Sequence, residues 1–236
     1  MINGRRVIAV ITARGGSKGL PRKALLDLGG RPVLAWSVAT AHAARFVDRV
    51  VVSSDDLEII AAARAAGGDA PFIRPPSLAQ DDSSIYDALF HALDSVDEAF
   101  DYVVLLQATS PLRIAIDIES CLQICETTQA PSCVSVMTAA KSPYWMFRID
   151  DEGQMHRLLD TAADRRQDLP PAVTLNGAVY AARIPWLRQS RTFVTDETRA
   201  YMMPPERSVD IDSRIDLLLA RALLRDKGQP GEGVEP

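Results

Sequence analysis

The densest group of residues that could do chemistry lies near the amino terminus, in residues 14–23. This segment combines three glycines with the cations Arg14, Lys18, Arg22 and Lys23. Glycines allow a backbone to approach a ligand closely and leave amide N–H groups free to point at it. Arginine grips phosphate through two parallel donors, and lysine supplies a mobile point charge. The segment is therefore a candidate cradle for a polyphosphate, and the alternative is a solvated basic turn.

Two known motifs can be compared with this segment. It lacks the G-x-x-x-x-G-K-[ST] spacing of a Walker A loop. Residues 15–19 formally match G-x-S-x-G, the nucleophile elbow of α/β-hydrolases, which places its serine in mid-chain on a turn between a strand and a helix. Here Ser17 follows the first predicted strand, and Pro21 and two more basic residues come next. These features argue against a serine hydrolase.

A second candidate group is acidic. Asp210 and Asp212 alternate with apolar residues, and in a strand the residues i and i+2 share one face. We therefore expect residues 208–212 to form a strand whose apolar side chains face the core while both carboxylates project together. Adjacent carboxylates repel each other unless a cation lies between them, and Mg²⁺ prefers such oxygen ligands. The alternative is an exposed strand end with a helix cap at Ser213.

Three further segments carry weaker signals. Residues 106–113 follow the most apolar predicted strand, where a glutamine or a serine would suit recognition of a base. Residues 165–167 supply two arginines and a glutamine, and residues 176–180 supply a side-chain amide. The three histidines are scattered along the chain, and we interpret them as structural or exposed residues.

Strands that alternate with helices must position these groups. Apolar runs predict strands at residues 7–11, 49–53, 102–106 and 133–137 and a short strand at 72–73, and helical patterns lie at 32–44, 56–66, 84–99 and 116–127. Such alternation implies βαβ units with right-handed crossovers. The predicted fold class is α/β, with a doubly wound, largely parallel, Rossmann-like sheet. Ligands of such sheets bind beyond the carboxyl ends of the strands, so the loops after Ile11, Val52 and Leu106 should form the site.

The regular alternation weakens after Tyr144. Residues 150–153 have the composition of a hairpin turn between two short strands. We interpret residues 142–173 as an excursion from the core sheet that serves as a lid or a dimerisation element. The core pattern returns at residues 174–184 and 205–223. Residues 1–226 are thus expected to form a single domain, and residues 227–236 a disordered tail.

The composition limits the class of protein. The 236 residues are 47% hydrophobic and 24% charged, which suits one domain with a sizeable core. The net charge is −5, from 26 basic and 31 acidic residues, and no basic stripe indicates a nucleic-acid partner. No run approaches the roughly 20 apolar residues of a membrane span, and no signal-peptide pattern precedes the first strand, so we expect a cytoplasmic protein. Cys121, Cys125 and Cys133 are interpreted as buried free thiols, because no C-x-x-C pair supports a zinc site.

Five segments, in order and at similar spacing, resemble the CMP-sialic acid synthetase (acylneuraminate cytidylyltransferase) family. They are residues 13–23, 52–56, 106–113, 165–170 with 176–180, and 210–212. The resemblance covers about residues 5–224. It implies a nucleotidyltransferase domain and a homodimer, and a reaction in which the anomeric hydroxyl of an acidic nine-carbon sugar attacks the α-phosphate of CTP. The products are a CMP-sugar and pyrophosphate.

The resemblance also implies roles for individual residues. Arg14, Lys23 and Asp212 are the implied catalytic set, and the implied nucleotide-binding residues are Arg14, Ser17, Lys18, Gly19, Lys23, Arg74 and Ser84. The residues implied to bind the sugar are Gln107, Asn176 and Tyr180, joined by Arg166 and Gln167 on an arm that reaches into the partner subunit's site. Asp210 and Asp212 are implied to hold Mg²⁺. The sequence identifies no general base, for which a metal-bound hydroxide and the carboxylates of Asp210 and Asp212 are candidates.

Two positions depart from the family pattern. The family usually has Asn after the lysine of the first loop, where this chain has Ala24, and Pro where it has Ala108. A lost hydrogen bond to a charged partner costs about 1.5–3 kcal/mol. Ala24 thus removes an amide near the nucleotide, which would weaken binding or reflect a different substrate. The alternatives to a sialic-acid enzyme are a cytidylyltransferase for legionaminic acid, pseudaminic acid or Kdo, and a non-catalytic nucleotide-binding protein of the same fold.

Overall fold

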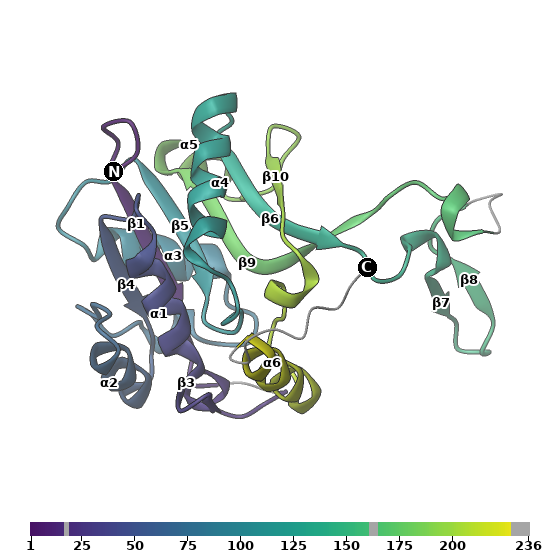
Figure 1. Ribbon diagram of the computed structural model, residues 1–236, viewed down its shortest axis with the longest axis horizontal. Helices are drawn as coiled ribbons and strands as arrows, with labels where there is room; N and C mark the ends of the chain where they lie inside the picture. The colour runs from purple at the N-terminus through teal and green to yellow at the C-terminus, as the bar shows by residue number, and fades with distance from the viewer. Residues whose placement is uncertain (17–18, 161–164, 228–236) are drawn as a thin grey trace.

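A six-stranded sheet forms the centre of the molecule (Figure 1). The computed structural model describes residues 1–16, 19–160 and 165–227. The strand order is β10-β6-β9-β5-β1-β4, and β9 runs antiparallel to its neighbours β5 and β6 while the other pairs are parallel. The strands are β1 (Val7–Thr12), β4 (Arg49–Ser53), β5 (Tyr102–Gln107), β6 (Ser132–Thr138), β9 (Val173–Arg183) and β10 (Arg199–Met202). The predicted doubly wound, largely parallel α/β sheet is confirmed.

Helices cover both faces of this sheet (Figure 1). One face packs against α1 (Val33–Ala43), α2 (Leu57–Ala65) and α4 (Ala115–Thr128), and the other against α3 (Ile85–Asp94) and α5 (Ile184–Ser190). The central strands are buried on both faces, which is why they read as unbroken apolar runs. A third core cluster joins α6 (Arg214–Lys227) to a small hairpin of β2 (Asp27–Leu28) and β3 (Arg31–Pro32).

The connections place a change of direction at the centre of the sheet. The chain passes from β1 through α1 to β4 on one side of β1, and then crosses back to β5 on the other side. In open α/β sheets the ligand crevice lies at such a point, beyond the carboxyl ends of the two strands. The segments that follow Thr12 and Gln107 therefore flank the expected crevice.

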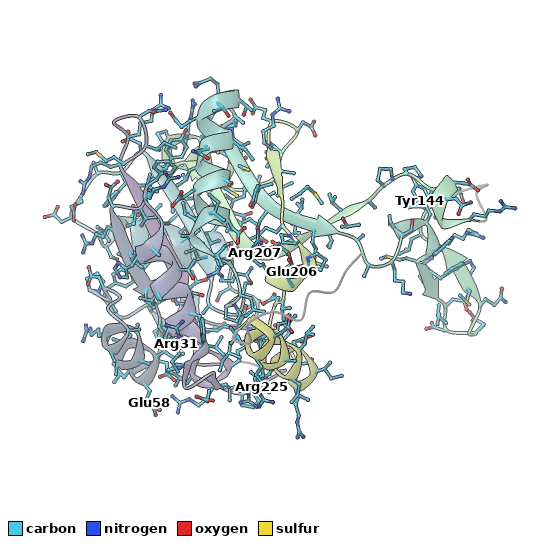
Figure 2. The ribbon with its side chains drawn as sticks, viewed as in Figure 1. Arg31, Glu58, Tyr144, Glu206, Arg207 and Arg225 are labelled. Atoms are coloured by element: carbon cyan, nitrogen blue, oxygen red, sulfur yellow. The ribbon has the colours of Figure 1, made fainter. Side chains whose placement is uncertain are left out.

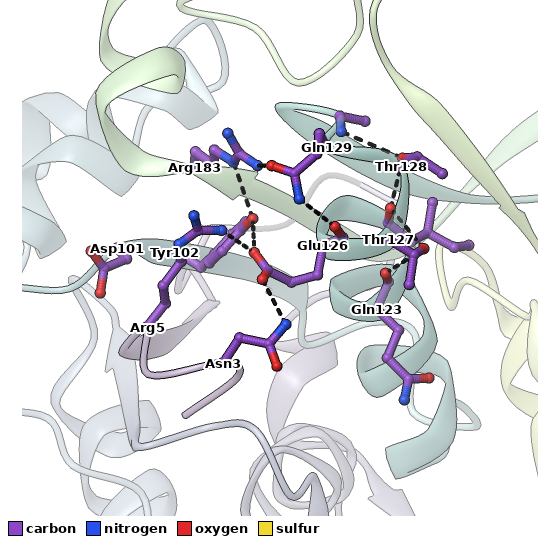
Figure 3. A network of polar contacts seen from close by, with 12 residues as sticks. Asn3, Arg5, Asp101, Tyr102, Gln123, Glu126, Thr127, Thr128, Gln129 and Arg183 are labelled. Carbon is purple, nitrogen blue, oxygen red and sulfur yellow. Dashed lines mark hydrogen bonds and ion pairs between the residues drawn. The ribbon is translucent and has the colours of Figure 1, made fainter.

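A polar network around Glu126 lies at the amino end of β5, opposite the end that flanks the crevice (Figure 3). Its carboxylate accepts hydrogen bonds from Asn3 Nδ2 at 2.9 Å and from Tyr102 Oη at 2.7 Å, and it also pairs with Arg5. Arg183 Nε donates to the same Tyr102 hydroxyl at 3.1 Å. The network joins the amino end of β5 to the carboxyl ends of β9 and α4, so it holds these elements together at the strand ends remote from the crevice.

An arm leaves the core between β6 and β9 (Figure 1). It spans residues 139–172, and its two ends are joined where Ala139 N donates to Ala172 O at 3.0 Å. The arm carries the hairpin of β7 (Phe147–Ile149) and β8 (Met155–Arg157), which confirms the predicted turn at residues 150–153. Most of its large apolar side chains are exposed, including Met146, Met155 and Leu158.

Several sequence predictions need correction. Residues 72–73 form no strand; instead Asp69 makes an isolated bridge with Val51. The helix expected to reach residue 99 ends at Asp94, where both the N and the Oγ of Ser95 donate to His91 O. Glu98, beyond this end, pairs with Arg6 and Arg49. Helix α5 and edge strand β10 were not predicted.

Other expectations about the chain can be compared directly. The three cysteines are free and buried, as interpreted. In the part of the chain that the structure describes, no helix has both the length and the apolar character needed to cross a membrane.

Candidate active site

A cavity of about 380 Å³ opens at the carboxyl ends of β1 and β5. Five of the residues singled out from the sequence line it: Arg14, Lys23, Arg74, Gln107 and Tyr180. They come from the loop after β1, the segment between α2 and α3, the end of β5, and β9. The sheet thus brings together groups that are up to 166 positions apart, from Arg14 to Tyr180 (180 minus 14).

A neighbouring cavity of about 240 Å³ shares Arg14 and Arg74 with the first. Arg14 Nη1 donates to Gln80 O at 2.8 Å, and Arg14 Nη2 lies 2.9 Å from Asp81 Oδ1. Ser84 lines this second cavity and also begins α3, since its Oγ accepts a hydrogen bond from Tyr86 N at 3.2 Å. The two cavities adjoin at Arg14 and Arg74, and together they are called the basic crevice here.

Arg74 is a fixed cation between the two cavities. It is 4% exposed, and its Nη2 donates to Ala13 O at 2.7 Å and to Ser53 O at 3.3 Å. Its Nε is buried without a hydrogen-bond partner among the described residues. Burial lowers the pKa of Arg74, and the carboxylate of Asp55 opposes that shift. A buried guanidinium with an unused donor is suited to a strong anionic ligand.

Lys23 begins the short helix η1 (Lys23–Leu25) at the end of the first loop. Its Nζ donates to Asp212 Oδ1 at 2.6 Å. Gly19 approaches the same residue, because a Cβ atom added to Gly19 would lie 2.7 Å from Asp212 O. Ala24, the departure from the family pattern, is buried in the cavity wall. Ser17 and Lys18 lie outside the described residues.

The acidic segment is held by its neighbours and not by the sheet. The prediction of a strand at residues 208–212 is wrong, although burial alternates there as expected. The segment lies between the short helix η5 (Pro205–Arg207) and α6, and Ile211 N donates to Thr109 O at 2.8 Å in the loop after β5. Arg207, labelled in Figure 2, anchors η5 to α4 through a bond to Asp117 Oδ1 at 2.9 Å.

Asp210 points into the space between β5 and β9. Its Oδ1 is buried without a hydrogen-bond partner among the described residues. A Cβ atom added to Gly177 would lie 3.4 Å from Asp210 Oδ2 and 3.3 Å from Gln107 Oε1, so three segments meet here. Burial raises the pKa of Asp210, and the charge of Asp212 adds to this shift, whereas the Thr109 hydroxyl and the charges of Lys23 and Arg113 oppose it.

A divalent metal fits this donor set only with help from a ligand. Among the described residues no three His, Cys, Asp or Glu side chains converge on one metal position. Asp210 offers a buried oxygen without a partner, and Asp212 lies exposed nearby with only the Lys23 ion pair to exchange. A hard cation takes six oxygen ligands, which two carboxylates and the phosphates of a nucleotide can share with water.

Sequence reasoning missed Arg113, which lies beneath the cavity. It is fully buried, its Nη1 donates to Ser37 Oγ at 2.7 Å, and its Nη2 donates to Gln107 O. Burial lowers the pKa of Arg113 to about 9, against the opposing charges of Asp210 and Asp117. An arginine at the end of the segment 106–113 was visible in the sequence, but nothing there indicated its burial.

An aromatic wall was also missed. Tyr86, Tyr180 and Phe193 line the cavity together, with the Phe193 ring centroid 5.9 Å from that of Tyr86 and 5.5 Å from that of Tyr180. Burial raises the pKa of Tyr180, and Asp210 adds to the shift. Phe193 lies in an irregular segment without periodicity, so the sequence held no signal for it.

Three residues expected to bind the sugar are not among the residues that line the cavity. Asn176 is buried beside the cavity, where its Nδ2 donates to Ser208 Oγ at 2.9 Å and its Oδ1 accepts from Ser135 Oγ at 2.6 Å. Arg166 and Gln167 belong to η4 (Arg166–Asp168) of the arm, and the arm projects away from the core sheet (Figure 1).

Comparison with known proteins adds independent information. A family model described as cytidylyltransferase matches residues 8–218. The CMP-N,N'-diacetyllegionaminic acid synthase of Legionella pneumophila is 32% identical over 229 residues, which cover 93% of this chain and 96% of that protein. The N-acylneuraminate cytidylyltransferase of Streptococcus agalactiae is 32% identical over 213 residues, covering 89% of this chain but 51% of that protein, so the chain spans about half its length.

A solved structure agrees in fold. CMP:2-keto-3-deoxy-manno-octonic acid synthetase, complexed with CTP, matches with a TM-score of 0.70 and 22% identity over 94% of this chain and 99% of that one. Of the segments that resemble the CMP-sialic acid synthetases in sequence, residues 165–170 lie on the arm and the others lie at the carboxyl ends of the strands, at or next to the cavity. With a matching family model across nearly all of the chain, they show that the protein is a nucleotidyltransferase of the cytidylyltransferase family, within the group of the CMP-sialic acid synthetases.

Proposed function

We propose that this enzyme transfers CMP from CTP to the anomeric hydroxyl of a sialic-acid-type nine-carbon sugar and releases pyrophosphate. The observation that carries the proposal is the arrangement of charges in one crevice. Arg14, Lys23 and Arg74 supply cations from three segments, and Asp210 and Asp212 supply carboxylates at its margin. Phosphoryl transfer needs chiefly positioning and neutralisation of charge, and this arrangement is suited to both.

Binding of a nucleotide would replace ion pairs that two cations of the crevice already make with carboxylates. Lys23 is paired with Asp212 and Arg14 with Asp81, and both pairs are partly exposed, so each contributes little to stability. A triphosphate can therefore take the two cations at small cost, while Arg74 stays fixed by its backbone contacts. Mg²⁺ bound by Asp210 and Asp212 would neutralise phosphate oxygens and polarise the α-phosphorus.

The acceptor sugar completes the reaction. Its anomeric oxygen forms a bond to the α-phosphorus, the bond from that phosphorus to the β-bridging oxygen breaks, and pyrophosphate leaves with the electron pair. The hydroxyl proton passes to a base, for which the carboxylate of Asp210 is the buried candidate. Gln107 and Tyr180 face the cavity beyond the nucleotide cations, so we assign them to the sugar.

N,N'-Diacetyllegionaminic acid is the second candidate substrate. The Legionella relative named for it matches this chain over nearly the full length of both proteins, whereas the streptococcal enzyme named for N-acylneuraminate is matched over half of its length. Both sugars are nine-carbon 2-keto acids, so the same attack on CTP applies to either. Their difference lies in substituents that the aromatic wall and Gln107 would meet.

We further propose a cytoplasmic homodimer, because CTP is a cytoplasmic nucleotide and the described residues of the arm include almost no buried apolar side chains. Isolated two-stranded hairpins are marginally stable in water, so the arm needs a surface to cover it. A second copy would supply that surface and receive Arg166 and Gln167 beside its cavity.

The test is release of pyrophosphate from CTP across a panel of acidic sugars: N-acetylneuraminic, N,N'-diacetyllegionaminic and pseudaminic acids and Kdo. We expect turnover with a nine-carbon sugar and CTP, and little with ATP, GTP or UTP. Equal turnover with UTP would contradict the assignment to cytidine. Turnover with none of the four sugars would contradict the proposed acceptor class.

A further inference from the structure

Two carboxylates lie beside the basic crevice, and the cap that Asp56 provides for α2 does not explain why both are acidic. Asp55 and Asp56 follow β4 after Ser54 and belong to one of the five segments that resemble the family. The ligand proposed for the crevice is a polyanion, and like charges within a few ångströms repel each other. Negative side chains at this place would weaken nucleotide binding unless they act on something other than the nucleotide.

Asp55 joins the first loop to the buried cation. Its Oδ1 accepts a hydrogen bond from Gly15 N at 3.1 Å, and the same oxygen lies 3.8 Å from Arg74 Nη2. Arg74 in turn donates to Ala13 O at the start of the loop. One carboxylate therefore ties the loop backbone and the fixed guanidinium into a single unit.

Asp56 holds the other end of the loop. Arg22 Nη2 lies 3.3 Å from Asp56 Oδ1 and 3.2 Å from Asp56 Oδ2, and Arg22 Nη1 donates to Glu58 Oε1 at 2.9 Å. Figure 2 labels Glu58 at the start of α2, on the outer margin of the molecule. The sequence placed Arg22 among the cations of the phosphate cradle, but the structure turns it toward α2.

These contacts require the backbone of Gly15 to lie close to the carboxylate of Asp56. A Cβ atom added to Gly15 would lie 2.8 Å from Asp56 Oδ2, closer than side chains tolerate. Arg22 adopts the left-handed conformation, with φ at 53°, which is disfavoured for a residue other than glycine. A strained residue persists where its surroundings fix it, and the three bonds to Asp56 and Glu58 provide that restraint.

We propose that Asp55 and Asp56 are positioning residues that preorganise the first loop for the triphosphate of CTP. They fix the loop at both ends, hold Arg74 toward the crevice and keep Arg22 out of it. Each carboxylate is neutralised by an arginine, so the pair adds little net negative charge where the nucleotide lies. This inference rests on the proposed binding of CTP at the loop.

If Asp55 and Asp56 position the loop, their substitution changes the affinity for CTP in the opposite direction from that expected from charge alone. Removing a negative charge near a polyanion should tighten its binding, whereas removing a positioning contact should weaken it. Asparagine is the right substitution, because its side-chain oxygen still accepts from Gly15 in place of Asp55, and because it is as good a helix N-cap as Asp56. Asp55→Asn and Asp56→Asn therefore keep the hydrogen bonds to the backbone. They remove the charge that pairs with Arg74 and with Arg22, which is the positioning contact under test.

The experiment measures CTP affinity by calorimetry and steady-state kinetics with varied CTP. We expect the Kd and KM for CTP to rise about fivefold or more in each variant, with kcat within about twofold and the KM for the sugar unchanged. The matched control is Asp94→Asn, which removes a similar exposed ion pair with Arg188 at the far end of α3. It should leave the CTP constants unchanged.

A double-mutant cycle locates the effect. Arg22→Met and Asp56→Asn should each weaken CTP binding, and the double variant should be no weaker than the poorer single one, because the two residues act as one unit. Tighter or unchanged binding in Asp55→Asn and Asp56→Asn, or additive losses in the cycle, would overturn the inference. A wild-type protein that does not bind CTP would overturn the proposed function as well, so the two failures are distinguishable.

Discussion

Lys23 Nζ lies 2.6 Å from Asp212 Oδ1, and this ion pair joins two residues that are 189 positions apart. The lysine belongs to the basic loop after β1, and the aspartate to the acidic segment before α6. The pair connects a residue that lines the cavity to the acidic segment, and the Asp212 side chain is 69% exposed. An exposed pair of this kind is worth at most about 1 kcal/mol, so it is a contact that the ligand can replace.

Asp212→Asn should abolish most of the turnover and leave the fold intact. The substitution keeps the shape of the side chain and removes the charge that would hold Mg²⁺. We expect turnover to fall by about 10²-fold, or about 3 kcal/mol of transition-state stabilisation. Initial rates against Mg²⁺ concentration measure this, and circular dichroism checks the fold. The control is Asp97→Asn, on an exposed turn; near-normal rates in Asp212→Asn, or full wild-type activity in excess EDTA, would show that no metal acts there.

Asp210→Asn should be more stable than the wild type at neutral pH while it is inactive. Burial raises the pKa of Asp210, so between its unfolded and folded pKa values the folded state binds more protons and the free energy of unfolding falls as pH rises. The amide removes this penalty. We expect a thermal midpoint higher by about 2–4 °C for each kcal/mol gained. The gain should vanish below about pH 4, where the unfolded carboxyl is protonated; a variant less stable at neutral pH would mean that Lys23 and Arg113 outweigh burial.

Gly177→Ala should disturb the sugar side of the cavity. Gly177 has a φ of +73°, and a new Cβ atom would press on Gln107 Oε1 and Asp210 Oδ2. Gly67→Ala is the matched control, because its φ is +88° and nothing lies within 4 Å of the added atom. Both variants should lose about 1–2 kcal/mol of stability, measured by chemical unfolding. We expect kcat/KM for the sugar to fall about tenfold or more only in Gly177→Ala, and equal kinetics in the two variants would argue against crowding.

The arm should make the protein a dimer with shared sites. Light scattering at micromolar concentration should give twice the chain mass of 25.7 kDa. Arg166→Ala and Asp212→Asn should each be inactive alone, but mixing and refolding them should restore about a quarter of the activity, because a mixed twofold dimer holds one intact site. A monomeric mass, or no recovery on mixing, would contradict the action of Arg166 across the interface.

Much of the core was predictable from local signals. The strands through residue 137 are unbroken apolar runs, and Asp56 and Ser84 supply the capping side chains of α2 and α3. The later elements were harder to find. Strand β10 lies at the edge of the sheet with most of its side chains exposed, so its pattern is weak. The alternation of residues 208–212 resembled a strand because two apolar side chains anchor an irregular segment to the core.

The residue types of the site could also be predicted, but not their partners. Sequence placed Arg14, Arg22 and Lys23 in one loop, and only the tertiary neighbours Asp56 and Glu58 show that Arg22 faces elsewhere. Asn176 was expected to face the sugar, and it lies instead in a buried network with Ser135 and Ser208. The partner of a polar side chain depends on residues distant in sequence, which local patterns do not report.

The reversed direction of β9 has a consequence for how the molecule is assembled. Because β9 runs against β5 and β6, it begins at the rim where β1, β5 and β6 end, with Thr138 opposite Val173. An insertion between β6 and β9 can leave the domain only at that rim, which is also the mouth of the cavity. A protein surface that packs against the insertion would therefore lie on the same side of the sheet as the cavity. In the proposed dimer this strand reversal would link the contacts between subunits to the chemistry, and changes of sequence in the insertion should then change the turnover.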